Sequence, residues 1–211
     1  MRMSRSSIVA VLVVVLAGSA AAADYWPLTP GATFTYQYGT GTPFTDEIVI
    51  NTTDPRFSGW FRRERTMSGY VRAWEYYLDG DGGDVLWGGY TTIGGIDPDQ
   101  KYFDPPVLLI KQPMTPGMYW QNPTTVDYMY GTHPATYWCW VYSGGTVSTP
   151  AGVFETVALR VTDGPAMPVR TYYLHRELGP VVIGSGFLLT GWTGVVSSDE
   201  ATWGEVKALY R

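Results

Sequence analysis

Apolar and polar side chains alternate with a period of two along several stretches of the chain. The alternation is clearest in three segments, 33–38, 70–78 and 153–162. Successive side chains of a β-strand point to opposite faces of a sheet, so this pattern predicts antiparallel strands with one buried face. Shorter apolar runs indicate further strands at 48–50, 107–110, 181–183 and 187–189. In total we expect about ten to twelve strands.

Turn-forming residues lie between these segments and argue against long helices. Gly, Pro and Asp cluster at 79–84, 94–99, 144–145 and 163–165, where we expect strands to reverse direction. For residues 200–210 a short helix is the alternative to a closing strand, and Gly204 favours the strand. The sequence therefore predicts an all-β protein with a curved antiparallel sheet, either a half-barrel or a closed barrel.

Two sequence motifs recur in the same order in the two halves of the chain. Pro-x-Thr-Pro-Gly occurs at 27–31 and again at 113–117, and Val-Arg followed by Tyr-Tyr-Leu occurs at 71–78 and at 169–174. Such recurrence indicates a duplication with halves at about 24–112 and 113–211. Chance recurrence in a chain rich in Pro, Gly and Tyr is the alternative. Either way we expect the strands to form a single domain, 24–211.

Residues 1–23 have the three parts of a secretory signal peptide. Arg2 and Arg5 are followed by an uncharged apolar stretch, 8–17, and by an alanine-rich end. The apolar stretch is shorter than the roughly 20 residues that a membrane span needs. We expect cleavage after Ala23 and export to the periplasm or the exterior. A buried N-terminal helix is the alternative.

Charge and composition narrow the classes of function. Without residues 1–23 the chain keeps 12 Lys and Arg against 19 Asp and Glu, a net charge of −7 that argues against a nucleic-acid partner. Charged residues make up only 16% of the chain, while its 32 aromatic residues suit β-strands. The one cysteine, Cys139, has no partner for an internal disulfide, so we expect it to be a small buried side chain.

The strongest metal-ligand pattern is the acidic loop that contains Asp79, Asp81 and Asp84. Three carboxylates in six residues are suitable ligands for calcium. The loop does not follow the EF-hand spacing, however, and a polar hairpin turn is the interpretation we favour over a calcium site. The sequence shows no motif for another metal or for a cofactor.

No constellation of residues predicts a catalytic centre. The two histidines, His133 and His175, are far apart in sequence, and Gly184-Ser185-Gly186 lacks the nucleophile elbow of serine hydrolases. The adjacent carboxylates Asp46 and Glu47 point to opposite faces of a strand, so we expect a solvated edge there. For Arg62-Arg63-Glu64-Arg65 we favour a solvent-facing strand or a guarded sheet edge.

Aromatic residues are more numerous than a core of this size requires. Nine Trp and 16 Tyr each bring a polar group that needs a hydrogen-bond partner or water. We expect some of the rings to line a cavity or groove, and five in predicted strands are the candidates: Trp74, Trp87, Trp120, Trp138 and Trp140. Ordinary packing with aromatic cross-strand pairs is the alternative.

Two further motifs carry a resemblance that covers nearly the whole mature chain. Residues 25–36 read Tyr-x-Pro-Leu-x-x-Gly-x-x-Phe-x-Tyr, and 149–157 read Thr-Pro-Ala-Gly-x-Phe-Glu-x-Val. The chain resembles a group of uncharacterised exported bacterial β-rich proteins with these motifs, similar in outline to LolA-like and lipocalin-like sheets. The resemblance implies a curved antiparallel sheet and brings no activity or catalytic residue with it.

Together these patterns predict an exported, non-enzymatic protein. We expect its concave face to bind an apolar or amphipathic ligand such as a lipid. The alternative is an envelope or surface module whose exposed aromatic residues recognise glycan or protein. A secreted hydrolase ranks third, because only export and spare carboxylates favour it.

Overall fold

The computed structural model describes residues 25–93, 99–163, 170–184 and 186–194. Within these ranges the chain forms twelve β-strands and two short 3₁₀ helices, η1 (Pro55–Phe57) and η2 (Asp81–Gly83). The strands are β1 (Thr33–Tyr38), β2 (Phe44–Ile50), β3 (Phe61–Met67), β4 (Tyr70–Asp79), β5 (Val85–Thr92), β6 (Gln100–Ile110), β7 (Tyr119–Tyr128), β8 (Gly131–Thr149), β9 (Gly152–Thr162), β10 (Arg170–His175), β11 (Gly179–Ile183) and β12 (Phe187–Thr193). The predicted signal peptide, 1–23, and the predicted closing strand, 200–210, lie outside the described residues.

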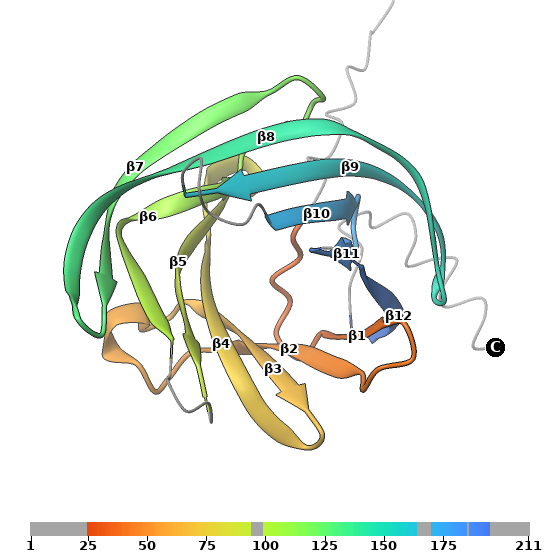
Figure 1. The fold of residues 1–211 in the computed structure, drawn as a ribbon, viewed down its shortest axis with the longest axis horizontal. Helices are drawn as coiled ribbons and strands as arrows, with labels where there is room; N and C mark the ends of the chain where they lie inside the picture. Colours follow the sequence, from red (N-terminus) through yellow and green to blue (C-terminus); the bar gives the residue numbers. More distant parts are fainter. Residues whose placement is uncertain (1–24, 94–98, 164–169, 185, 195–211) are drawn as a thin grey trace, which may run out of the picture.

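The strands form one closed antiparallel barrel. Each strand pairs with its neighbours in sequence, and β1 pairs with β12 to complete the circle (Figure 1). The closing register runs from Thr33 opposite Thr193 to Tyr38 opposite Phe187. Closure pairs the outermost strands with each other, which removes the exposed edges of an open sheet. The prediction of an all-β fold is confirmed, and of the two expected forms the closed barrel is the observed one.

Period-two alternation decides which side chains fill the barrel. In β2, Phe44, Asp46 and Ile48 point inward and are buried, while the residues between them are more exposed. In β3 the inward row continues with Arg63 and Arg65, because each inward residue of β2 lies opposite an inward residue of β3. The interior is therefore apolar over much of its length and charged where these two strands meet.

Strand β4 has buried side chains on both of its faces. The register against β5 shifts between Tyr76 and Tyr77, and both tyrosines are buried. Tyr77 packs inside the barrel against Trp26, whereas Tyr76 stacks outside on Phe57 with 4.3 Å between ring centroids. Tyr76 therefore lies in the outward row with Trp74, as the alternation over 70–78 predicts, and the extra residue at the register shift is Gly88 of β5.

The segment before β1 fills one part of the lumen. Figure 1, which looks into the barrel, shows residues 25–32 running across its interior. Trp26 is buried there, with its ring centroid 5.4 Å from that of Tyr77 and 5.3 Å from that of Tyr172. Leu28 is also buried and belongs to the same interior cluster. This segment therefore acts as a plug inside the barrel.

The two Pro-x-Thr-Pro-Gly motifs form the same hydrogen-bonded turn. Ala32 N–H donates to Thr29 O at 3.0 Å, and Met118 N–H donates to Thr115 O at 3.1 Å. The glycine of each motif also donates to a strand carbonyl, Gly31 to Ile48 in β2 and Gly117 to Val141 in β8. Each predicted half contains six strands, so β2 and β8 hold equivalent places. A duplication would produce this correspondence, and it stays a prediction.

Candidate ligand cavity

The barrel interior contains a cavity of about 400 Å³, here called the inner cavity. Its apolar lining comes from both sides of the β1–β12 closure and includes Phe44, Met67, Ile183 and Phe187. Its charged lining is Arg63, Arg65, Glu75 and Arg170. Cavities of this size, largely apolar with a few polar groups, are typical of small-molecule sites in proteins.

A second cavity of about 290 Å³, here called the mouth cavity, adjoins the inner cavity. Tyr90 and Arg170 line both cavities. Trp87, Lys101 and Tyr137 also line the mouth cavity, together with Asp99 and Asp163. The side chains of Arg170 and Tyr90 therefore stand between two connected regions of the barrel interior.

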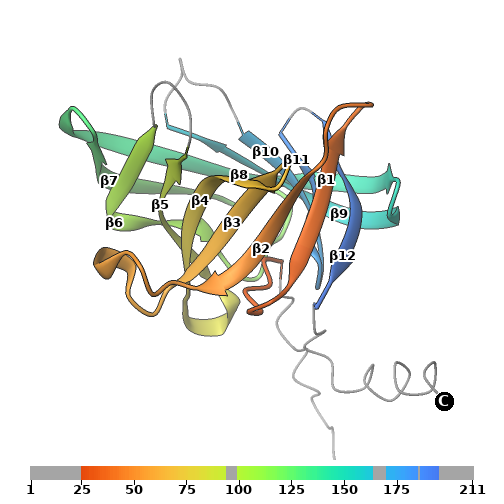
Figure 2. The ribbon, with the colours of Figure 1, turned by 90° about the horizontal axis from the view of Figure 1, so that it is seen from below.

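Strand register separates the apolar lining of the inner cavity from its charged lining. Phe44, the first residue of β2, pairs with Met67, the last residue of β3. This pair lies beside the turns that Figure 2 shows at one end of the barrel. The next inward pair along these strands is Asp46 with Arg65, and Arg63 lies one inward position further. Inward positions are about 6.6 Å apart along a strand. The charged residues Asp46, Arg63 and Arg65, here called the charged layer together with Glu75 and Arg170, therefore lie deeper in the barrel than the apolar rim that includes Phe44, Met67 and Phe187.

Asp46 is the centre of a buried ion-pair cluster. Its carboxylate is 2.7 Å from Arg63 Nη2 and 2.9 Å from Arg65 Nε, and it is 0% exposed. Arg63 Nη2 also donates to Tyr36 Oη at 3.2 Å, and Tyr36 in turn donates to Pro180 O at 2.7 Å. Removing charges from water costs free energy, and ion pairs offset that cost. The stability of this cluster therefore depends on the Asp46 carboxylate, which pairs with both arginines.

Glu75 and Arg170 extend the charged layer across the cavity. Glu75 accepts a hydrogen bond from Tyr77 Oη at 2.8 Å, and its other carboxylate oxygen is 3.7 Å from Arg170 Nη1. Burial alone would raise the pKa of Glu75, but the positive charges of Arg65, Arg63 and Arg170 outweigh burial and lower it. Glu75 is therefore ionised at neutral pH, which leaves three arginines against two carboxylates in the layer.

Two buried N–H donors beside the cavities have no acceptor among the described residues. One is Nε of Arg63, which lines the inner cavity, and the other is the indole Nε1 of Trp87, which lines the mouth cavity. Trp87 is only 4% exposed. A buried donor without an acceptor costs free energy, so these positions favour a ligand that brings acceptor oxygens.

The five candidate tryptophans lie on different sides of the barrel wall. Trp87 and Trp120 are buried inside, where Trp120 Nε1 donates to Leu108 O at 2.7 Å. The other three, Trp74, Trp138 and Trp140, point outward, since the adjacent residues Glu75, Tyr137 and Cys139 face the interior. A ligand inside the barrel can contact Trp87 and cannot contact the three outward rings.

The outward tryptophans form two separate clusters. Trp138 and Trp140 stack at 6.0 Å between centroids, with Tyr119 beside them at 6.0 and 5.6 Å. Trp74 lies under the guanidinium of Arg62 at 4.7 Å and lines an outer groove. The first cluster therefore contains two of the three outward candidates, Trp138 and Trp140.

The charged lining is the part of the site that the sequence interpretation missed. We expected Arg62-Arg63-Glu64-Arg65 to face solvent and Asp46 to lie at a solvated edge, and both predictions are wrong for the inward residues Arg63 and Asp46. The available signal was the alternation itself. Arg63 and Arg65 lie on the same face of β3 as the apolar residues Phe61 and Met67, and these apolar residues mark that face as inward.

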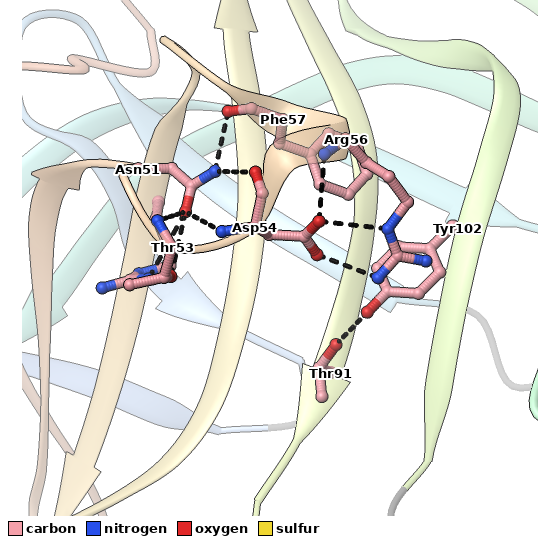
Figure 3. A network of polar contacts seen from close by, with 8 residues as sticks. Asn51, Thr53, Asp54, Arg56, Phe57, Thr91 and Tyr102 are labelled. Carbon is pink, nitrogen blue, oxygen red and sulfur yellow. Dashed lines mark hydrogen bonds and ion pairs between the residues drawn. The ribbon is translucent and has the colours of Figure 1, made fainter.

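A polar network outside the barrel fixes the connection between β2 and β3. In Figure 3, Asn51 Nδ2 donates to the backbone oxygens of Asp54 and Phe57 at 2.8 and 2.7 Å, and Arg56 reaches the carboxylate of Asp54. The Arg56 guanidinium lies 3.6 Å from the Tyr102 ring centroid. Donors and acceptors satisfy one another here, so we interpret the network as structural.

Gly88 explains how this connection comes so close to β5. A Cβ at Gly88 would lie 2.5 Å from Phe57 Cε1 and 2.7 Å from Trp60 Cζ3. The absence of a side chain therefore allows both rings to pack directly on the outer face of the barrel.

The acidic loop does not assemble a metal site. Asp84 Oδ1 accepts a hydrogen bond from Gln112 N at 2.7 Å, and η2 forms the turn between β4 and β5. Within the described ranges no three His, Cys, Asp or Glu side chains converge as metal ligands, and this includes Asp79, Asp81 and Asp84. The turn that we favoured for this loop is the observed structure.

Each of the two histidines contacts an aromatic ring, and Cys139 is buried. His133 stacks on Tyr128 at 4.5 Å, and burial lowers the pKa of His175, which packs against Phe154. Cys139 is fully buried, as expected, and burial raises the pKa of its thiol to about 12. A thiol with so high a pKa is a poor nucleophile.

Fold and cavity together define a class of protein, the closed antiparallel β-barrel with an internal cavity. Comparison of the chain with known protein families, with curated proteins and with solved structures gives no match. Among the described residues, no helix has the length and apolar content that a membrane crossing requires.

Proposed function

We propose that this protein is an exported, non-enzymatic binding protein that holds an amphipathic, lipid-like molecule inside its barrel. The observation that carries the proposal is the inner cavity, with an apolar rim that includes Phe44, Met67 and Phe187 above a charged layer. An amphipathic ligand matches both parts, since its chain removes apolar surface from water while its polar end reaches the charges.

The chemistry of the charged layer favours binding over catalysis. Arginine stays protonated at every physiological pH, so Arg63, Arg65 and Arg170 are unsuited to proton transfer. The lowered pKa of Glu75 makes it a weak base and removes its proton at neutral pH. The layer can therefore supply fixed charges and hydrogen bonds, which are what a binding site needs.

The export part of the proposal depends on residues 1–23, whose charged start, apolar stretch and alanine-rich end match a secretory leader. A carrier of a lipid-like molecule is useful in an aqueous compartment, where such a molecule is poorly soluble.

The direct test is titration of the purified protein with the fluorescent fatty acid cis-parinaric acid. We expect saturable binding with one site per barrel. Organic extraction of the purified protein followed by mass spectrometry should release an amphiphile in a comparable molar amount. The absence of both saturable binding and an extracted amphiphile would contradict the proposal.

A cavity-filling variant ties that binding to the inner cavity. Ala73 lines the cavity, whereas its neighbour Arg72 is exposed. We expect Ala73→Trp to abolish parinarate binding and Arg72→Trp to leave it unchanged. If Ala73→Trp fails to fold in thermal unfolding, Ala73→Leu provides the milder filling and should weaken binding. Equal binding by the folded Ala73 and Arg72 variants would place the probe elsewhere.

The aromatic cluster of Tyr119, Trp138 and Trp140 favours a second candidate, a surface module for glycan or protein. Tyr119 is 44% exposed, and nearby Tyr142 is 47% exposed. Aromatic side chains of this kind are enriched in recognition surfaces. Pull-down on peptidoglycan and on envelope extract tests this candidate, and Trp138→Ala should weaken retention while leaving parinarate binding unchanged.

A further inference from the structure

The ligand proposed above has a polar end of unspecified charge, and the charged layer carries information about it. Arg63, Arg65 and Arg170 provide three positive charges, while Asp46 and Glu75 provide two negative charges. The layer therefore holds one excess positive charge beside the inner cavity. In the mouth cavity Lys101 adds a positive charge, and the carboxylates of Asp99 and Asp163 accept hydrogen bonds from Tyr90 and Tyr137, so the excess applies to the inner cavity alone. Excess charge in a poorly hydrated site is costly unless a counter-ion accompanies it.

Arg170 is the least neutralised of the three arginines. Asp46 engages Arg63 and Arg65 at 2.7 and 2.9 Å, whereas the distance between Arg170 and Glu75 is 3.7 Å. The Arg170 side chain remains 44% exposed, and it lines both cavities. An anion in the interior can reach Arg170 without breaking a close ion pair.

The unpaired donors match the excess charge in sign. Nε of Arg63 and Nε1 of Trp87 both donate, and neither has an acceptor among the described residues. The Arg170 guanidinium lies 5.6 Å from the Trp87 ring centroid, so the indole and Arg170 belong to one region. Positive charge and spare donors together specify an anionic, oxygen-bearing group.

We infer that the head group of the ligand is an anion, of which a carboxylate is the simplest, and that Arg170 is its principal contact. The inference rests on the proposed binding function and adds the charge of the head group and its orientation. The head points toward the charged layer, and the chain lies against the apolar rim beside Phe44, Met67 and Phe187.

The experiment compares three probes with the same chain: laurate, lauryl alcohol and laurylamine. Each displaces parinarate from the purified protein below its micelle concentration. We expect laurate to bind most tightly, the alcohol at least about tenfold more weakly, and the amine most weakly, because a charge-assisted hydrogen bond is lost and then replaced by repulsion. Equal displacement by laurate and the alcohol would overturn the inference and leave the proposed function intact.

Variants of two arginines test the assignment to Arg170. Arg170→Met keeps a long apolar side chain and removes the charge, and we expect it to weaken laurate binding about tenfold or more while binding of lauryl alcohol stays unchanged. Arg160→Met is the matched control, because Arg160 is exposed on the neighbouring strand β9. A loss of laurate affinity equal in both variants would contradict the role of Arg170. Failure of every probe to bind the wild-type protein would refute the proposed function itself.

Discussion

The two sides of the barrel interior are built from the same alternation and filled in different ways. On the β5–β8 side, aromatic rings pack edge to face, with centroid distances of 4.7 Å for Trp87 and Phe103 and 4.9 Å for Phe103 and Tyr137. On the β2–β4 side, the inward positions hold Asp46 and Arg63 in a buried ion pair. Both sides bury their inward side chains, but only the second buries charges.

The two sides contribute differently to stability and to binding. Close-packed apolar side chains stabilise a fold without further partners, and packing accounts for most of the ring cluster on the β5–β8 side. Trp87 is the member of that cluster that also borders the mouth cavity and Arg170. Buried ion pairs are seldom more stable than apolar residues of the same volume. If stability were the only requirement, apolar residues could replace Arg63 and Arg65 without loss. We therefore interpret the charged side as the functional one.

The largest expected effect comes from removing the shared carboxylate. Asp46→Ala leaves Arg63 and Arg65 without their common counter-ion, and we expect a loss of about 3–5 kcal/mol in the free energy of unfolding. Urea denaturation followed by tryptophan fluorescence measures it. The control Asp127→Ala removes an exposed carboxylate and should change stability by about 0.5 kcal/mol or less.

Replacing the whole cluster separates stability from function. In the variant Asp46→Leu, Arg63→Met, Arg65→Met all three charges are gone, and we expect most of the lost stability to return. Laurate binding should nevertheless weaken, because two of the three arginines are missing. A variant that is stable and binds laurate as well as the wild type would contradict a functional role for the charged side.

The packed side should respond to loss of volume. Ile110 is fully buried in the interior cluster, and we expect Ile110→Ala to cost about 2–5 kcal/mol of unfolding free energy through lost contacts and a new cavity. Ile50 is 55% exposed, so Ile50→Ala provides the control. If both variants lose the same small amount, the packed side is less important for stability than we infer.

Acid should weaken the charged side through Glu75. Its pKa in the folded protein is lowered, mainly because neighbouring arginines outweigh burial, and the unfolded value is about 4.3. The stabilisation is therefore present above the unfolded pKa and is lost as the pH falls through the folded pKa. Below about pH 4.3 we expect the unfolding free energy of the wild type to fall more steeply than that of Glu75→Gln. Parallel curves from urea denaturation across this pH range would contradict the assignment.

The smallest expected effect is outside the barrel. Trp138→Ala removes ring contacts with Tyr119 and Trp140 and should cost about 1 kcal/mol or less. Because Trp138 points outward, displacement of parinarate by laurate should not change. A clear loss of laurate affinity in this variant would move the binding site to the outer surface.

The sequence predicts most of the local structure because alternation and turn residues are local signals. The reversal expected at 144–145 is wrong, because β8 continues through these residues with a register shift against β9. The buried row of β1, Phe34 and Tyr36, follows directly from period two. Closure between β1 and β12 joins residues 160 positions apart, such as Thr33 and Thr193, and no local pattern specifies it. The choice between a half-barrel and a barrel therefore needed the structure.

The site was harder to predict than the fold for two physical reasons. Alternation does not say which face is inward where both rows of a strand are apolar or aromatic, as at 137–141. Trp138 and Trp140 were therefore grouped with Trp87, although they lie on the opposite side of the wall. Charged residues are usually exposed, which led us to place Arg63 in solvent. Burial of Arg63 depends on Asp46, a partner on another strand that the sequence pattern does not identify.

The most direct test follows the indole N–H signals of the tryptophans by NMR during titration with laurate, with each signal assigned from a Trp→Phe variant. We expect the Trp87 signal to shift saturably at one laurate per barrel, because its indole N–H has no acceptor among the described residues and Trp87 lines the mouth cavity beside Arg170. The signals of Trp138 and Trp140 should stay in place. Shifts confined to the two outward tryptophans, or no shift at all, would contradict a binding site inside the barrel.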